Sequence, residues 1–162
     1  MAGVFLSHSS VDKAIVSRIA VDLANRGIPI WFASWELETG DSLYDRIFSG
    51  IDQTTYLVLV LSPDSVCSRW VGKELNAALA KEHQLGRKVI IPIKIAQCAV
   101  PLAIADRLYG DFTRGYLKAV EQLEAFLRRS GIDAAAVPLH QQIIPLVFTK
   151  GLYLDQARSR GI

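Results

Sequence analysis

The stretch TTYLVLVLSPDSVCSRWVGKEL, residues 54–75, decides how this chain folds. Its first part, Thr54–Leu61, is β-branched and aliphatic without polar alternation, which is typical of a strand covered on both faces. The tripeptide SPD at residues 62–64 interrupts the apolar run, and we expect a loop there and then a helix that carries Trp70 and Glu74. A buried strand followed by a helix is the repeating unit of parallel α/β sheets.

The same alternation of strand and helix continues on both sides of this stretch. Strands are expected at Gly3–Ser7, Ile28–Ala33, Lys88–Ile95 and Arg107–Phe112, and helices at about 9–25, 42–53, 70–85 and 116–129. The first of these helices is expected to begin with a capping pattern, Ser9 followed three residues later by Asp12. The alternation predicts an open, mostly parallel sheet with helices on both faces.

Composition narrows the class of protein. The chain has 162 residues, of which 51% are hydrophobic, and a formal net charge of +2. That length suits one domain with a real core. The charge is too near neutral for nucleic acid to be the main partner.

The few cysteines and histidines argue against two common kinds of site. Cys67 and Cys98 form no CxxC pair and no disulfide framework, which fits a reducing cytoplasm. The three histidines lie far apart in the sequence without the spacing of metal ligands, so no metal site is expected. The chain shows no signal peptide and no apolar segment of membrane-spanning length, so we expect a cytoplasmic protein that makes no membrane contact of its own.

Three loops are expected to converge at one edge of the sheet. In the strand order 2-1-3-4-5, which we adopt, ligands bind beyond the carboxyl ends of the first and third strands, where the order reverses. Residues 7–9 follow the first strand, a loop from Ser34 follows the second, and Ser62 follows the third. Trp70 and Glu74 are four residues apart and share one helical face. A carboxylate beside an indole at this edge is a candidate site for holding and cleaving a nucleotide.

Each of these residues also has an ordinary structural explanation. Glu74 taken alone suits a solvated helix face, and Trp70 taken alone suits a core. The spacing of the two favours a functional role. His8 suits a structural or loop-orienting role better than that of a general base.

Four segments together resemble one known family. They are VFLSHSSVD at 4–12, WFASWELETGDS at 31–42, LSP at 61–63 followed by WVGKEL at 70–75, and DF at 111–112. In this order and spacing they resemble a Toll/interleukin-1 receptor (TIR) domain of the bacterial type, over about residues 3–130. The resemblance implies a TIR domain at 1–131 and a C-terminal extension or linker at 132–162. It also implies a flavodoxin-like α/β fold, an open parallel five-stranded sheet in the order 2-1-3-4-5.

In catalytic members of this family, the resemblance implies cleavage of the nicotinamide–ribose bond of NAD+, to nicotinamide and ADP-ribose or a cyclic variant of ADP-ribose. The family's catalytic glutamate falls on Glu74, and the tryptophan of its WxxxE pattern falls on Trp70. Substrate contacts are expected from Trp70, Ser7, His8, Ser9, Trp35 and Ser42. NAD+ is then the substrate, and no cofactor is expected.

The resemblance also implies assembly. Self-association through the loop called BB, here Trp35–Leu43, completes the site in a homo-oligomer. Another domain or another TIR protein is a further expected partner. The bacterial style of the segments implies a setting in immune signalling, either in defence against phage or in virulence.

The chemistry is compatible with a single carboxylate. Hydrolysis of sugar polymers usually needs two carboxyl groups, one of which protonates a poor leaving group. The nicotinamide of NAD+ is already a cationic pyridinium and leaves as a neutral molecule, so no general acid is required. Glu74 alone can then stabilise the oxocarbenium-like transition state electrostatically.

Two other functions remain open at this point. A non-enzymatic interaction module would recruit other TIR domains through Trp35–Leu43 and would have no use for Glu74. An enzyme like a nucleoside deoxyribosyltransferase also uses a glutamate on an α/β sheet. It would leave the segment at 7–12 and the BB loop unexplained.

Overall fold

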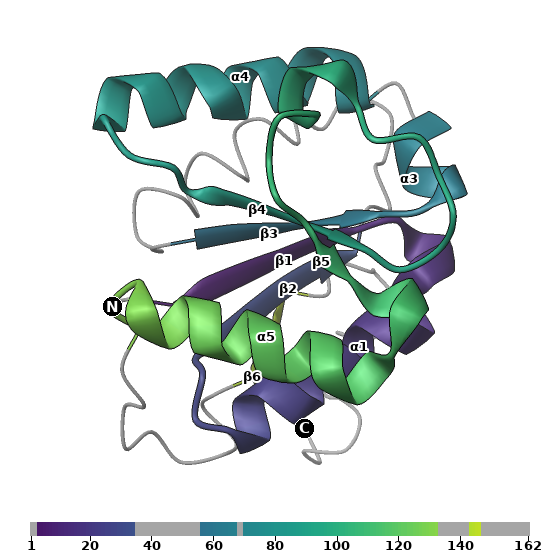
Figure 1. Cartoon of the computed structure of the whole chain (residues 1–162), viewed down its shortest axis with the longest axis vertical. Helices are drawn as coiled ribbons and strands as arrows, with labels where there is room; N and C mark the ends of the chain where they lie inside the picture. The colour runs from purple at the N-terminus through teal and green to yellow at the C-terminus, as the bar shows by residue number, and fades with distance from the viewer. Residues whose placement is uncertain (1–2, 35–55, 68–69, 133–142, 147–162) are drawn as a thin grey trace, which may run out of the picture.

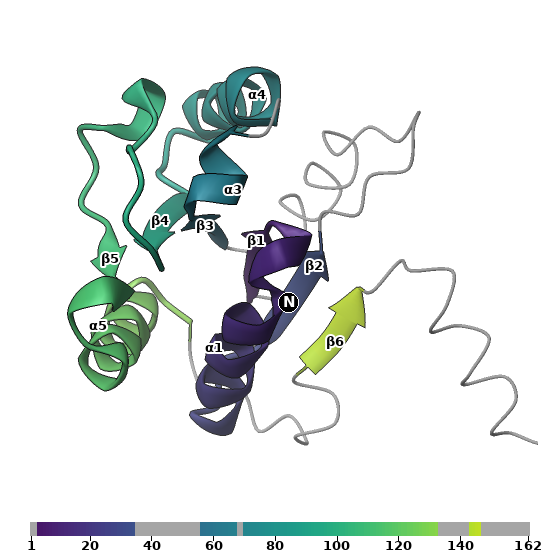
Figure 2. The same cartoon turned by 90° about the vertical axis from the view of Figure 1, so that its right-hand side faces the viewer.

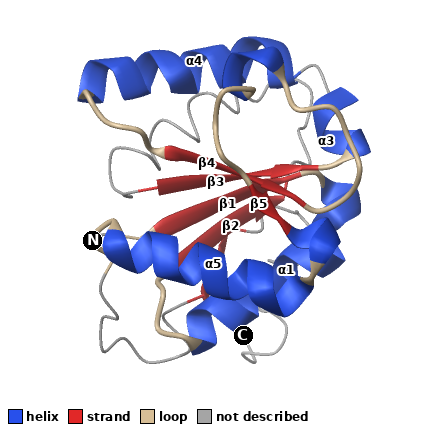
Figure 3. Cartoon of the chain, in the orientation of Figure 1, coloured by secondary structure: helices blue, strands red, loops and turns tan. Residues whose placement is uncertain are grey.

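The computed structural model describes residues 3–34, 56–67, 70–132 and 143–146 (Figure 1). In these residues one sheet is formed by β1 (Val4–His8), β2 (Ile30–Ser34), β3 (Tyr56–Leu61), β4 (Ile90–Lys94), β5 (Gly110–Asp111) and β6 (Ile143–Leu146). The helices are α1 (Lys13–Asn25), α3 (Pro63–Cys67), α4 (Trp70–Leu85) and α5 (Tyr116–Arg129) (Figure 3). Short 3-10 turns lie at Ser10–Asp12, Leu102–Ile104 and Phe112–Arg114.

The strands are parallel and follow the order β5-β4-β3-β1-β2-β6. The central part of the sheet confirms the predicted order 2-1-3-4-5. The predicted number of five strands is wrong, because β6 pairs with the outer side of β2, with Ile143 opposite Ile30. Pro145 has no N–H to donate, which is tolerated because β6 is the last strand of the described sheet. β6 lies within residues 132–162, and the domain boundary at residue 131 stays a prediction.

Helices cover both faces of the sheet, as predicted. Figure 2 shows α1 and α5 on one face and α3 and α4 on the other. Alternation along β1 separates the two cores, because successive side chains of a strand point to opposite faces. Val4 and Leu6 belong to the core under α1 and α5, whereas Phe5 belongs to the core that contains Leu75 of α4.

The two long helices of the second half match their predicted bounds. The helix at 116–129 is confirmed as α5, and the helix that carries position 74 ends at Leu85. Gly86 follows at φ 65°, in the left-handed region that favours glycine. The strand predicted at Lys88–Ile95 is shorter, as β4. The strand predicted at Arg107–Phe112 contains only Gly110–Asp111, because Phe112 begins a 3-10 turn and the Arg107 side chain pairs with Glu82 of α4.

A short helix occupies the segment after β3, where residues 62–64 were expected to form a loop. Pro63 is the first residue of α3, a position where its missing N–H costs nothing. The two serines that flank it cap each other. The Ser62 N–H donates to Ser65 Oγ (2.8 Å), and the Ser65 N–H donates to Ser62 Oγ (3.1 Å).

Some expectations concern residues outside the described part of the chain. They are the helix at about 42–53 and the BB loop, Trp35–Leu43. Among the described residues, no helix has both the length and the apolar character to cross a membrane. Cys67 and Cys98 carry free thiols.

Candidate functional site

The predicted site lies at the edge of the sheet formed by the carboxyl ends of β1, β2 and β3. The register places His8 of β1 beside Ser34 of β2, and Ser62 directly follows the last residue of β3. α4 connects this edge with the amino end of β4, so its first turn starts at the carboxyl edge and the helix runs back across the sheet (Figure 1). Trp70 is the first residue of α4, and position 74 lies about one turn further along.

The last two residues of β1 point to opposite faces of the sheet. Ser7 and His8 are 1% and 0% exposed. By the alternation of the strand, Ser7 shares the face of Phe5 and α4, and His8 shares the face of Leu6 and α1. Ser9 is half-buried. The structure therefore brings Ser7 to the side of the sheet that α4 covers and directs His8 away from it.

Burial determines the charge of His8. Removal from water lowers the pKa of His8 to about 4, a hydrogen bond with the backbone of Leu6 opposes that change, and the charge of Lys13 adds to it. The imidazole is therefore neutral at pH 7 and is a weak base. This environment favours the structural role for His8, while its contact with substrate stays a prediction.

The burial of His8 predicts a specific loss of stability in acid. Because the pKa of His8 is lower in the folded chain than in the unfolded one, the unfolded chain binds a proton first as the pH falls. We expect His8 to have no effect on the free energy of unfolding above about pH 6.5, and to lower it by up to about 3 kcal/mol as the pH falls to about 4. Urea denaturation at pH 7.0, 5.5 and 4.0 measures this loss.

The comparison is between the parent chain and a His8→Gln variant. Carboxylates whose pKa is lowered in the folded state, among them Glu82 and Glu124, also lower the stability in acid. They are present in both proteins, so their contribution cancels when the two losses of unfolding free energy are subtracted. The variant is expected to lose less stability between pH 6.5 and pH 4 than the parent. Equal losses in the two proteins would refute the prediction.

The predicted cap of the first helix is wrong in its hydrogen bonds. Neither Ser9, which precedes the 3-10 turn, nor Asp12, which precedes α1, caps its element through its side chain. The Asp12 carboxylate instead accepts a hydrogen bond of 2.5 Å from Ser62 Oγ, across the ends of β1 and β3. Burial raises the pKa of Asp12, the bond from Ser62 opposes the shift, and the nearby charge of Asp64 adds to it.

α4 carries the two residues on which the predicted chemistry depends. Its described side chains begin at Leu75, which is buried against the sheet together with Ala78. These contacts fix the helix over the α4 face of the sheet. The side chains of Trp70 and Glu74 lie outside the described part of the chain, as do Trp35 and Ser42. The substrate contacts proposed for these four residues stay predictions.

A hollow of about 480 Å³ lies at the other end of α4. Its exposed lining residues are His83, Gly86, Arg87 and Lys88, and the less exposed ones are Leu79, Glu82 and Arg107. Glu82 is eight residues beyond position 74, or about 12 Å along the helix. The hollow therefore lies at the amino ends of the strands, the edge where parallel sheets do not bind ligands. Among the described residues, no group of three His, Cys, Asp or Glu side chains could hold a metal ion.

The model of the TIR domain family matches residues 4–127. The chain belongs to the TIR domain family. The match covers all the described strands except β6 and nearly all of α5.

Several curated proteins are similar to this TIR domain. The 2' cyclic ADP-D-ribose synthase BtTIR of Bacteroides thetaiotaomicron is 41% identical over 90 residues, which are 55% of this chain and 31% of that protein. The NAD(+) hydrolase TcpA of a Theionarchaea archaeon is 29% identical over 135 residues, which are 80% of this chain and 41% of that protein. The chain spans less than half the length of the curated relatives that it matches.

Solved structures agree in fold. The TIR domain of the Toll-related receptor TRR-2 from Hydra magnipapillata has a TM-score of 0.52 at 19% identity, over 77% of this chain and 97% of that one. A TIR-STING receptor from C. gigas has a TM-score of 0.55 at 20% identity, over 75% of this chain and 38% of that one. At these identities the likeness shows the α/β fold alone.

Proposed function

We propose that this TIR domain cleaves the bond between nicotinamide and ribose in NAD+, with Glu74 as the catalytic carboxylate. The observation that carries the proposal is the position of α4 in a TIR fold. The helix with Trp70 and Glu74 begins at the carboxyl edge of β1 and β3, where a parallel sheet of this order binds ligands. The names of the similar proteins, NAD(+) hydrolases and 2' cyclic ADP-D-ribose synthases, support the same reaction.

In the proposed reaction, the bond between ribose C1′ and the pyridinium nitrogen breaks, and its electron pair goes to nicotinamide. Nicotinamide leaves as a neutral molecule, so the site needs no proton donor. The Glu74 carboxylate stabilises the positive charge that develops on the ribose. Water then attacks C1′ and loses a proton to give ADP-ribose, or a hydroxyl of the same molecule attacks in its place and gives a cyclic product.

We further propose that the site is completed by self-association through the BB loop, Trp35–Leu43. Trp35 and Ser42, which we expect to contact the substrate, belong to this loop. Activity per protein molecule should then rise with protein concentration, because the assembled form is populated only when association is favourable.

The direct experiment is incubation of the protein with NAD+ at low and high protein concentration, followed by mass spectrometry of the products. We expect release of nicotinamide with an equal amount of ADP-ribose or a cyclic isomer, and a higher specific activity at high concentration. No loss of NAD+ at any concentration, with or without a crowding agent, would contradict the proposal. If such a sample still binds a second TIR domain, the non-enzymatic interaction module is the better explanation.

A further inference from the structure

Asp12 and Ser62 join two loops that are far apart in the sequence. Ser62 Oγ donates to Asp12 Oδ2 at 2.5 Å, between residues 50 positions apart. Asp12 ends the 3-10 turn that follows β1, and Ser62 directly follows the last residue of β3. The strands themselves are held by their ladder, with Ser7 opposite Leu59. The bond lies beyond the last paired residues of the two strands and joins the two segments that follow them, at the edge where the candidate site is expected.

Ser62 carries this connection into the next helix. Its hydroxyl accepts the N–H of Ser65 (3.1 Å), its own N–H donates to Ser65 Oγ (2.8 Å), and its carbonyl accepts from the same hydroxyl (3.1 Å). Ser65, in the first turn of α3, is therefore bonded to Ser62 three times. α3 ends at Cys67 and α4 begins at Trp70, so only two residues of sequence separate α3 from the helix that carries Glu74.

Asp12 bonds to Ser62 and not to the first turn of the helix that it precedes. A carboxylate that precedes an α-helix ordinarily accepts the free N–H groups of the first turn, but the Asp12 side chain makes no such cap. Its carboxylate lies instead in a partly buried place near the negative charge of Asp64, both of which disfavour ionisation. The arrangement gives up a stabilising cap of α1 in favour of a connection to Ser62.

We propose that Asp12 is a positioning residue, which holds α3, the helix that precedes α4 and Glu74 in the chain, at a fixed place relative to the loop after β1. The inference rests on the proposed NAD+ cleavage and assigns to Asp12 and Ser62 a role in it that requires no contact with substrate. Without this bond, both strands should stay paired and α4 should stay packed on its core. The position of α3 relative to the loop after β1 would then no longer be fixed. Displacement of a catalytic group by about 1 Å can reduce a rate by about a hundredfold.

The test is a double-mutant cycle with Asp12→Ala, Ser62→Ala and the double variant. Each single substitution is expected to lower kcat by about tenfold or more with a smaller change in KM, since orientation rather than binding is lost. The double variant should be no slower than the slower single variant, because both remove the same bond. Asp12→Asn retains an oxygen that accepts from Ser62, and Ser62→Thr retains the hydroxyl, so both should retain most of the parent kcat.

A matched control exists between α1 and α5, on the face of the sheet opposite α4. Tyr116 Oη donates to Asp22 Oδ2 at 2.5 Å, a bond of the same kind that joins α5 to α1. Tyr116→Phe removes it and is expected to lower the melting temperature without changing kcat. If the Asp12 and Ser62 variants lose kcat only in proportion to their melting temperature, as a purely structural role predicts, the inference is wrong.

The outcomes separate the two proposals. A parent chain that cleaves NAD+ and an Asp12→Ala variant with the same kcat would overturn the positioning role and leave the function intact. Additive losses in the double variant would also overturn it. A parent chain that never cleaves NAD+ would overturn the function, and the positioning role with it.

Discussion

Exchange of Glu74 for glutamine is expected to lower the rate of NAD+ cleavage by about a hundredfold or more, which is typical of removing a central electrostatic stabiliser. Glutamine has nearly the shape of glutamate and the same helix propensity, so the helix should persist while the negative charge is lost. The charge is what the proposed mechanism uses, since nicotinamide leaves without a proton donor. We expect kcat and kcat/KM to fall together.

Initial rates of nicotinamide release at low and saturating NAD+, together with thermal melting, measure this effect. Glu121→Gln on the exposed face of α5 is a matched control, because it makes the same exchange of side chain on the opposite face of the sheet from α4. The control is expected to keep both rate and melting temperature. A Glu74→Gln protein that consumes NAD+ at the parent rate would remove the carboxylate from the mechanism.

The sequence predicts best those helices and strands whose pattern of apolar residues lies within the element itself. The apolar stripe of α5 repeats with the period of a helix, and residues 116–129 form that helix. The apolar run that begins the decisive stretch forms β3 from Tyr56, buried on both faces by the two cores. Parallel pairing and the place of α4 at the carboxyl edge follow from the alternation of such elements, because a short right-handed crossover permits few other arrangements.

The features that the sequence does not predict depend on distant contacts. The pattern at residues 9–12 is compatible with a cap of α1 and with a bond to another loop, and only the fold brings Ser62 within reach of Asp12. The pairing of β6 with β2 likewise joins residues more than a hundred positions apart. One local signal was available for α3: a serine before a proline, with a second serine three residues after the first, is typical of a capped helix start.

The ion pair between Glu82 and Arg107 also joins residues that are separated in the sequence, and the sequence around Glu82 gives a partial indication of it. Leu75, Ala78, Leu79 and Glu82 recur at the spacing of one helix face, so a carboxylate occupies a position of the apolar stripe of α4. Charged residues are rarely buried unless they are paired. The sequence therefore indicates a buried pair, but it does not identify Arg107, which lies 25 residues away in the connection between β4 and β5.

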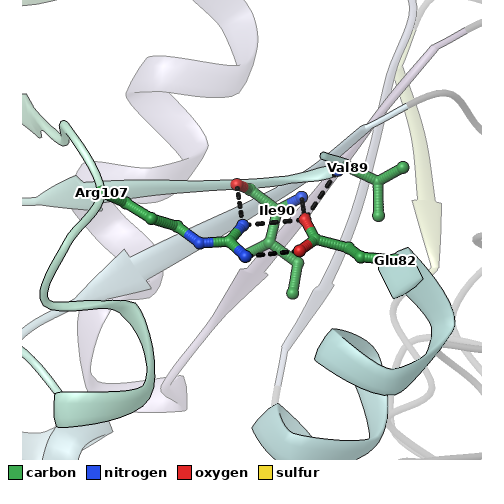
Figure 4. Close-up of polar contacts among 4 residues, drawn as sticks. All are labelled: Glu82, Val89, Ile90 and Arg107. Carbon is green, nitrogen blue, oxygen red and sulfur yellow. Dashed lines mark hydrogen bonds and ion pairs between the residues drawn. The ribbon is translucent and has the colours of Figure 1, made fainter. Parts of the chain in front are cut away.

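Substitution of Glu82 by alanine is expected to lower the free energy of unfolding by about 3–5 kcal/mol, a large part of the about 5–15 kcal/mol that stabilises a typical domain. The Glu82 and Arg107 side chains are 7% and 11% exposed. Glu82 Oε1 accepts from the N–H groups of Val89 and Ile90 (2.7 Å each) and from Arg107 Nη1 (2.8 Å), and Oε2 pairs with Nη2 (Figure 4). Burial acts to raise the pKa of Glu82, but these bonds together lower it. Alanine would leave the N–H groups of Val89 and Ile90 without their acceptor, and the buried guanidinium of Arg107 without its counter-charge and with only the Ile90 carbonyl to accept from it.

Urea denaturation of Glu82→Ala, Arg107→Ala and a Glu82→Met/Arg107→Leu double variant separates the cost of an unpaired charge from the value of the pair. Each single alanine variant should be less stable than the apolar double variant, because a buried charge without a partner is costlier than an apolar replacement of the whole pair. Glu124→Ala on α5 is the control. Its pair with Arg26 is more open, with side chains 18% and 34% exposed, and such a pair contributes about 1 kcal/mol or less. If Glu82→Ala costs no more than Glu124→Ala, the buried pair of Glu82 and Arg107 contributes no more to stability than the more exposed pair of Glu124 and Arg26, and the prediction is wrong.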